Sequence, residues 1–485
     1  MKLANTAKTC RLRDNFSKIC QRQARNYADL STTPSNIFDV VCVGGGPAGL
    51  SLLAALRSIR ATKNLKVALV DTVNLDKTRS LLSSSPFSNR VSSITPSSMR
   101  FLDQIGAWNL VQSDRVQAYH EMQVWDGVSD ARIEFNWQPA EKIDNIAYMT
   151  ENLNLTSALL TRIKELGGVE IFDNQKLIKI DYGMEAEQED LRTWPVVHLQ
   201  CGEKLVARLL VGADGANSHV RTFAGIGSRG WDYDRVGVVA TLKLQGSGWN
   251  LNGCKTAYQR FLPTGPIAML PLPGNYSTLV WSTTPERADC LKRLNSTDFI
   301  AMINAAFRLS PVDISYMHGL DSGQHEELVW RLQHTKVETR KIPQDVVEVQ
   351  ERSIASFPLK MRHADTYISE RVALVGDAAH SIHPLAGLGL NQGQADVESL
   401  VKTIKNAVIH GEDIGVSMTL EPYNAERYAA NHVLLGVVDK LHKLYSVESG
   451  PLVPLRSLGL RTVNSFKLLK QFFMEQAART GTNLL

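Results

Sequence analysis

Three short motifs, each placed directly after an apolar run typical of a buried strand, constrain the fold of this 485-residue chain more than any other feature. The first motif spans residues 44–49, has the sequence GGGPAG, and stands between an apolar run at 38–43 and an apolar helical pattern at 50–56. A glycine-rich turn between strand and helix directs backbone N–H groups and the positive end of the helix at a diphosphate. The motif therefore predicts an α/β unit that binds a dinucleotide.

Each glycine of this turn has a predicted role. Gly44 permits the tight turn, Gly46 lets the backbone approach a pyrophosphate, and Gly49 allows close packing of the helix on the sheet. A second apolar run ends at Asp71, which is placed to hydrogen-bond a ribose 2′-hydroxyl and favours an unphosphorylated ribose. This unit alone does not separate FAD from NAD, and an ordinary glycine turn is the alternative interpretation.

The other two motifs present carboxylates just past predicted strands. Residues 212–215, with the sequence GADG, follow the run 208–211, although Asp-Gly by itself is an ordinary turn signal. Gly376 and Asp377 follow the run 371–375. Ligands of open α/β sheets bind beyond the carboxyl ends of the strands, so Asp377 is available to the hydroxyls of a ribityl chain.

Together the three motifs resemble those of the p-hydroxybenzoate-hydroxylase-like flavoprotein monooxygenases. Residues 383–396, HPLAGLGLNQGQAD, are similar to the signature of the ubiquinone-biosynthesis hydroxylases, whose mitochondrial branch is the coenzyme Q monooxygenase family. The resemblance runs from about residue 38 to about residue 428 and is weakest between 246 and 350. It implies FAD as cofactor, with Asp214 serving both FAD and the approach of the reductant and with Gly376 and Asp377 holding the ribityl chain.

The resemblance also implies further site residues. Arg90 would approach the flavin diphosphate and Asn152 would hydrogen-bond the cofactor. A loop would face the flavin with its main chain and continue into a helix whose dipole points at the ring; its residues are Pro384, Gly387, Leu388, Gly389, Leu390 and Asn391. Leu388 departs from the family, whose members commonly carry Gln there.

No side-chain base is assigned, because oxygen transfer itself requires none. His380 and His383 are either catalytic bases or structural residues hydrogen-bonded near the flavin edge, and the structural interpretation is the more economical one. The histidines and acids show no metal-ligand spacing, so no metal site is predicted.

The predicted fold class is α/β: a Rossmann-like FAD-binding domain with an inserted antiparallel-sheet substrate domain and a C-terminal helical region. The expected segments are a mitochondrial transit peptide (1–27), FAD-binding parts (36–110, 146–230 and 359–412), substrate-domain strands (111–145), a substrate-domain sheet (231–358) and C-terminal helices (413–485). No apolar run approaches the ~20 residues that span a bilayer.

The first 27 residues differ in composition from the rest. They hold seven basic residues and one acid, Asp14, without the apolar core of a secretory signal, which is typical of a mitochondrial transit peptide. A basic arm for nucleic acid is the alternative, but removal of this segment would change the formal net charge from +4 to −2. No nucleic-acid partner is therefore predicted, and the scattered cysteines fit a reducing compartment.

The C-terminal segment 464–479 has the pattern of a basic amphipathic helix. Such a helix binds an anionic membrane surface or a partner, or packs on its own core. With Pro451 and Pro454 as a hinge, deletion of the residues after Ser446 is expected to release the protein from mitochondrial membranes without loss of FAD.

The resemblance implies an FAD-dependent monooxygenase of ubiquinone biosynthesis that hydroxylates the ring of a polyprenylated phenol or hydroxybenzoate with O₂, through a flavin hydroperoxide. Ferredoxin and its reductase are the favoured electron donor and NAD(P)H is the alternative. The predicted location is the matrix side of the mitochondrial inner membrane, as a peripheral protein among other coenzyme Q biosynthesis proteins. The alternatives are an epoxidase or prenyl reductase of the same fold, or a flavin-binding structural subunit of the complex.

Overall fold

A computed structural model of the protein describes residues 36–77, 82, 87–136, 145–183, 190–246, 255–335, 341–382, 389–447 and 449–465. The predicted transit peptide, the flavin-facing residues 383–388 and the tail from residue 466 lie outside these ranges.

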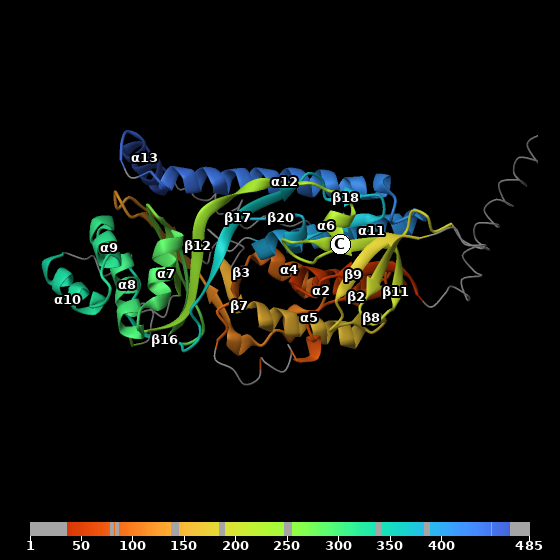
Figure 1. The fold of residues 1–485 in the computed structure, drawn as a ribbon, viewed down its shortest axis with the longest axis horizontal. Coiled ribbons are helices and arrows are strands. Elements are labelled where there is room, and N and C mark those ends of the chain that lie inside the picture. The colour runs from red at the N-terminus through yellow and green to blue at the C-terminus, as the bar shows by residue number, and fades with distance from the viewer. Residues whose placement is uncertain are drawn as a thin grey trace, which may run out of the picture.

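A largely parallel sheet forms one half of the molecule (Figure 1). Its strands lie in the order β18-β19-β11-β1-β2-β8, and β10 and β9 extend from β11 as antiparallel neighbours. Their bounds are β1 Ile37–Val43, β2 Val67–Val70, β8 Val169–Phe172, β9 Leu177–Tyr182, β10 Pro195–Leu199, β11 Lys204–Gly212, β18 Ile368–Ser369 and β19 Val372–Leu374. The central strands β1, β2 and β19 are buried along nearly their whole length, as strands covered on both faces are.

Three helices pack against one another beside this sheet: α2 Pro47–Ser58, α5 Asn152–Leu166 and α11 Gly389–His410. Leucines and alanines of α2 are fully buried, because the helix lies between the sheet and its neighbours. Two shorter helices, α4 Pro96–Gln104 and α6 His219–Phe223, complete this half.

A nine-stranded sheet forms the other half, in the order β20-β17-β12-β15-β14-β13-β5-β6, with β16 also paired to β12. The pairing is antiparallel except between β13 and β5. The bounds are β5 Glu121–Asp126, β6 Arg132–Asn136, β12 Ser228–Leu244, β13 Thr256–Leu262, β14 Gly265–Pro271, β15 Tyr276–Thr283, β16 Val346–Val349, β17 Ala355–Ala364 and β20 His380–Ser381. Helices α7 Pro285–Arg293, α8 Ser296–Arg308, α9 Pro311–His318 and α10 Gln324–His334 gather at its far end (Figure 1).

Strand pairing differs from the predicted segment boundaries in three places. The boundary at 231 falls inside β12 and the boundary at 358 falls inside β17. Strand β4, Val116–Tyr119, pairs with β7, Ala147–Glu151, in a separate three-stranded sheet completed by β3, Val91–Ile94. The long strands β12 and β17 therefore run from one half of the molecule into the other, which the alternation pattern did not reveal.

Two helices close the described chain, α12 Ser417–Tyr445 and α13 Leu452–Ser465 (Figure 1). α13 is tied to the nine-stranded sheet, because Arg456 donates two hydrogen bonds of 3.0 Å to Asp126 and both side chains are fully buried. Pro454 lies in the first turn of α13, where proline is tolerated, rather than in a hinge. A cut after Ser446 would leave Asp126 buried without its partner, so the truncation that tests the tail belongs after Ser465.

Among the helices that the structure describes, none is both long and apolar enough to cross a bilayer.

Candidate active site

The strand register brings the three sequence motifs to one edge of the parallel sheet. Val43 of β1 is paired with Gly212 of β11 and with Val70 of β2, and Gly212 is paired in turn with Leu374 of β19. Because these strands are parallel, their carboxyl ends meet at one edge, where open α/β sheets bind ligands. Motifs separated by more than 150 residues in the chain therefore become neighbours.

Gly44 is required where the first two motifs touch. Its φ is +113°, and a Cβ there would lie 2.2 Å from the carbonyl oxygen of Ala213. A Cβ on Gly49 would lie 2.0 Å from the carbonyl oxygen of Gly44. Any side chain at either position would force the turn or the helix apart.

Among the described residues, the amino end of α2 is open. Gly46 caps the helix without a side-chain hydrogen bond, Pro47 occupies the first turn, and a Cβ on Gly46 would meet no atom of this part of the chain within 4 Å. A helix start with unpaired N–H groups and no covering side chain fits a diphosphate. Gly376, at φ +60°, adjoins this turn, since its Cβ would lie 3.4 Å from that of Ala48.

Asp71 lies against the glycine turn. One carboxylate oxygen accepts from the backbone N–H of Gly45 and the other accepts from that of Val73 at 2.6 Å. Each oxygen keeps a further lone pair, so the predicted contact with a ribose hydroxyl stays possible beside a role in shaping the turn.

Asp214 provides a polar atom that the protein does not satisfy. Its Oδ2 accepts from the backbone N–H groups of His219 and Val220 at 2.7 and 3.3 Å. Its Oδ1 is buried and has no hydrogen-bond partner among the described residues. Buried carboxylate oxygens are normally paired, so this atom fits a site that receives a donor from a ligand.

Asp377 follows Gly376 in a short 3₁₀ turn, Gly376–Ala378. Its side chain is exposed, yet desolvation by the surrounding protein raises its pKa; His380 opposes this shift and Asp396 adds to it. An acid that is accessible and also surrounded by protein lies in a recess of the surface, as a ribityl-binding acid would.

A buried polar network supports this turn from behind. Asp396 of α11 accepts from the backbone N–H of Gly376 at 3.1 Å and lies 2.6 Å from Nε2 of His380. Arg427 and Asn431 of α12 donate to its other oxygen at 2.9 and 3.0 Å. Burial opposes ionisation of Asp396, but His380 and Arg427 outweigh burial and hold the pKa of this carboxyl well below its usual range. The arrangement favours the structural interpretation of His380.

Several residues predicted to bind the cofactor are engaged with the protein. Asn391 is buried, accepts from the backbone N–H of Thr95 at 2.9 Å and donates to the carbonyl of Ser93 at 2.7 Å. The side chain of Asn152 accepts from the hydroxyl of Ser92 at 2.6 Å. Arg90 is exposed.

The remaining flavin-facing residues divide between described and undescribed parts of the chain. Gly389 and Leu390 open α11. Pro384, Gly387 and Leu388 lie outside the described residues, as does His383. Cofactor contacts for all of the predicted site residues stay predictions.

Sequence reasoning missed two supporting residues, Glu151 and Asp396. Glu151 is buried, forms a two-pronged ion pair with Arg115 at 2.6 and 2.9 Å, and accepts from the backbone N–H of Ser88 near Arg90. Asp396 closes the signature stretch, but its partner Arg427 lies 31 residues away. No local pattern indicated either pair.

Apolar side chains surround the entry to the undescribed loop. Ile382, the last residue before position 383, packs with Leu434 and Leu435 of α12 and with Phe261 and Met361 of the nine-stranded sheet. This packing forms an apolar surface around the residue that directly precedes the predicted flavin-facing segment.

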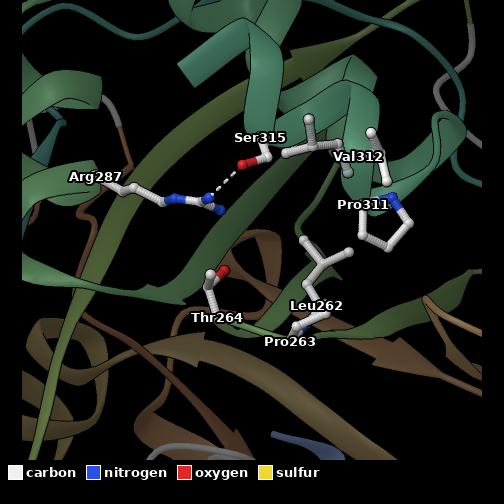
Figure 2. A pocket seen from close by; sticks show the side chains of 8 residues that line it. Leu262, Pro263, Thr264, Arg287, Pro311, Val312 and Ser315 are labelled. Atoms are coloured by element: carbon white, nitrogen blue, oxygen red, sulfur yellow. Dashed lines mark hydrogen bonds between the residues drawn. The ribbon is translucent and has the colours of Figure 1, made fainter. Parts of the chain in front are cut away.

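A surface pocket lies elsewhere (Figure 2). It is formed by the β13–β14 turn at residues 262–264 and by the helices at the far end of the substrate sheet, where Arg287 donates to the hydroxyl of Ser315 at 2.8 Å. This pocket lies beside α7 and α9, away from helix α2 and its glycine turn (Figure 1), so it is separate from the predicted cofactor site.

The chain matches the FAD binding domain family over residues 38–319 and 319–435. A Schizosaccharomyces pombe protein named ubiquinone biosynthesis monooxygenase COQ6, mitochondrial, is 41% identical over 452 residues, which are 91% of this chain and 92% of the relative. The Homo sapiens protein of the same name is 37% identical over 456 residues, 94% of this chain and 95% of the relative.

Solved structures share the fold. Pseudomonas aeruginosa PqsL in complex with 2-aminobenzoylacetate has a TM-score of 0.64 at 20% identity, covering 88% of this chain and 99% of that one. The p-nitrophenol 4-monooxygenase PnpA of Pseudomonas putida has a TM-score of 0.64 at 18% identity, covering 91% and 98%.

The prediction of the fold class is confirmed by these structures, and the prediction of FAD as cofactor is confirmed by the matched FAD binding domain. Identity to the curated relatives extends over more than nine-tenths of the chain, well beyond the motifs themselves. The chain belongs to the family of FAD-dependent monooxygenases of mitochondrial ubiquinone biosynthesis.

Proposed function

We propose that the protein hydroxylates the aromatic ring of a polyprenylated phenol or hydroxybenzoate intermediate of ubiquinone biosynthesis, using FAD and O₂. The observation that carries the proposal is the meeting of the three motifs at one sheet edge, beside the apolar packing around Ile382. The first half of the site suits a dinucleotide and the second half suits an apolar ring.

Each part of the site has a proposed task in holding FAD. The open amino end of α2 receives the diphosphate at Gly44 and Gly46, and Asp71 receives the adenosine ribose. Asp377 binds the ribityl hydroxyls, while Asp214 accepts a hydrogen bond from the cofactor with its otherwise unpaired Oδ1. Bound FAD supplies the activation of O₂ for oxygen transfer to an electron-rich ring.

The protein's own part in the reaction is placement and exclusion of water. Apolar side chains of α12 and of the nine-stranded sheet surround Ile382, so a ring held there would lie in a dry compartment. Main-chain N–H groups of residues 384–391 are proposed to face the flavin and to stabilise negative charge on it. The network centred on Asp396 holds the Gly376–Asp377 turn in place.

The electron donor, the partners and the location are also proposals. We favour ferredoxin with its reductase over NAD(P)H, since the Schizosaccharomyces pombe and Homo sapiens relatives are named mitochondrial. The protein is proposed to act on the matrix side of the inner membrane, as a peripheral member of an assembly of coenzyme Q biosynthesis proteins. The alternatives, a flavin-binding structural subunit or another reaction on the same fold, are not favoured, because the relatives are named monooxygenases.

The proposal is tested with protein expressed from Ala28 onward. Its absorption spectrum should show bound flavin, and anaerobic photoreduction followed by O₂ and a short-chain polyprenyl phenol should give a ring with one inserted oxygen. Peroxide release without product would reject this substrate class. The Asp377→Ala variant should lose FAD and accumulate the pathway precursor in cells, whereas a purely structural subunit would still support the pathway.

A further inference from the structure

The second half of α12 is apolar on opposite faces. Leu435 and Val438 point inward, where they are buried in the apolar clusters of the substrate sheet. Val433, Val437 and Leu441 repeat at every fourth position on the other side and are 67%, 49% and 39% exposed. An exposed apolar patch marks a site of interaction with a protein or a membrane, so this outward stripe is expected to be covered by something.

α13, which lies at the end of α12 (Figure 1), also exposes apolar side chains. Leu452, Leu455 and Leu458 are exposed by 44%, 63% and 63%. The buried bond of Arg456 to Asp126 fixes which side of α13 faces the protein. These three leucines are therefore held outward by the fold.

The charges beside these apolar residues have one sign. In α12 from residue 429 onward and in α13, the exposed ionic side chains are Lys440, Lys443 and Arg461. Asp439, the acid in α12 from residue 429 onward and in α13, is buried and ion-paired with Lys443 at 2.8 Å. The surface is therefore apolar with a basic margin, which complements an anionic lipid surface.

An exposed tryptophan adjoins this margin. Trp231 of β12 is 41% exposed, and the ammonium group of Lys443 lies 4.7 Å from the centre of its ring. Tryptophan and lysine side chains have an apolar body and a polar end, and both are favoured where water meets lipid.

We propose that the outward faces of α12 and α13, with Trp231 at their margin, dock on an anionic lipid bilayer. The inward face of α12 packs on Ile382, directly before the predicted flavin-facing segment. A substrate whose isoprenoid tail lies in the bilayer would thus reach the active compartment past the helix that touches the lipid. Only this last step rests on the proposed function, because the docking itself depends on the surface alone.

The test compares two triple variants of the holoenzyme in flotation with vesicles of phosphatidylcholine, with or without phosphatidylglycerol. Val437→Gln, Leu455→Gln and Leu458→Gln together should lower partition onto the anionic vesicles by about tenfold or more, because apolar area no longer leaves water. Val312→Gln, Val329→Gln and Val347→Gln form the matched control, since these valines are similarly exposed at the far end of the substrate sheet. The control should partition like the wild type.

A charge variant tests the anionic part of the proposal. Lys440→Gln with Arg461→Gln should lower partition onto the phosphatidylglycerol vesicles by about tenfold at low salt and leave partition onto phosphatidylcholine alone unchanged. Equal loss on both kinds of vesicle, or no loss in the apolar variant, would overturn the proposal. Variants that bind vesicles like the wild type but no longer bind another coenzyme Q biosynthesis protein would show that this surface is a protein interface instead.

Turnover of a water-soluble phenol distinguishes a failure of the docking proposal from a failure of the proposed function. All of these variants should keep the flavin spectrum and the turnover of the soluble ring, while the apolar variant loses turnover of a long-chain substrate held in vesicles. A wild type that binds vesicles but never oxidises the soluble phenol would refute the function and leave the docking surface standing.

Discussion

Asp396 and Asp126 are both fully buried and both bonded to an arginine, but they fix different parts of the molecule. Asp126 uses its two oxygens to hold Arg456 and the turn at Val128 and Ser129, so it joins α13 to the substrate sheet. Asp396 also accepts the backbone N–H of Gly376, directly before the predicted ribityl acid. Similar burial therefore serves the attachment of α13 in one region and the geometry of the predicted ribityl-binding turn in the other.

The largest effect is expected from Arg456→Ala. Removal of one partner leaves Asp126 as an uncompensated buried charge, which should lower the free energy of unfolding by roughly 3–5 kcal/mol. Chemical denaturation followed by tryptophan fluorescence measures this loss. The double change Asp126→Leu with Arg456→Met should restore most of the stability, because it removes both charges and keeps apolar volume. A single variant as stable as the wild type would show that α13 is not anchored by this pair.

Asp396→Asn should be somewhat less destabilising but should also weaken cofactor binding. Asparagine can still accept from Arg427 and Asn431, yet its amide group cannot accept from Gly376, so we expect a loss of about 3 kcal/mol in stability. Loosening of the Gly376–Asp377 turn should raise the Kd for FAD by about tenfold.

Asp126→Asn is the matched control for this variant. It should lose a comparable amount of stability while its folded fraction binds FAD with the affinity of the wild type. FAD titrations of the two asparagine variants, at a temperature where both are folded, give the comparison. Equal FAD affinities in the two variants would remove the distinction between the two aspartates.

The features of these two regions were not equally predictable from the sequence. The glycine turns and Asp377 were predictable because a strand, a turn and a helix start leave local signals with physical causes. Asp396 with Arg427 and Asp126 with Arg456 were not, since each pair forms across elements 31 and 330 residues apart. Likewise, β12 and β17 pair with each other over a long antiparallel register and so run from one half of the molecule into the other. The alternation of apolar residues does not show how far such pairing continues.

Gly46→Ala tests the predicted cofactor site without changing a buried charge. A Cβ at Gly46 meets no atom of the described residues within 4 Å, so the free energy of unfolding of the apoprotein should stay within about 0.5 kcal/mol of the wild type. The same methyl group would occupy the space proposed for the diphosphate, and the Kd for FAD should rise by roughly tenfold. Gly44→Ala, whose Cβ would collide with the carbonyl oxygen of Ala213, should instead destabilise the apoprotein. An alanine at Gly46 that leaves FAD binding unchanged would contradict the proposed diphosphate position.

The smallest effect is a pH dependence to which the region around Asp396 contributes through one buried histidine. His363 is buried beside Tyr367, and burial, with His380 and His432 nearby, lowers its pKa to about 4. The unfolded chain therefore takes up a proton on His363 near pH 6.5, whereas the folded protein does so only as the pH approaches 4. This contribution to stability is fully present above pH 6.5 and is lost as the pH falls toward 4. One such proton changes the free energy of unfolding by at most about 1.4 kcal/mol per pH unit. Denaturation measured between pH 7 and pH 5 should therefore have a smaller slope in His363→Gln than in the wild type. The double change Asp126→Leu with Arg456→Met should keep the wild-type slope, because it removes a pair that contains no histidine and leaves no unpaired buried carboxylate.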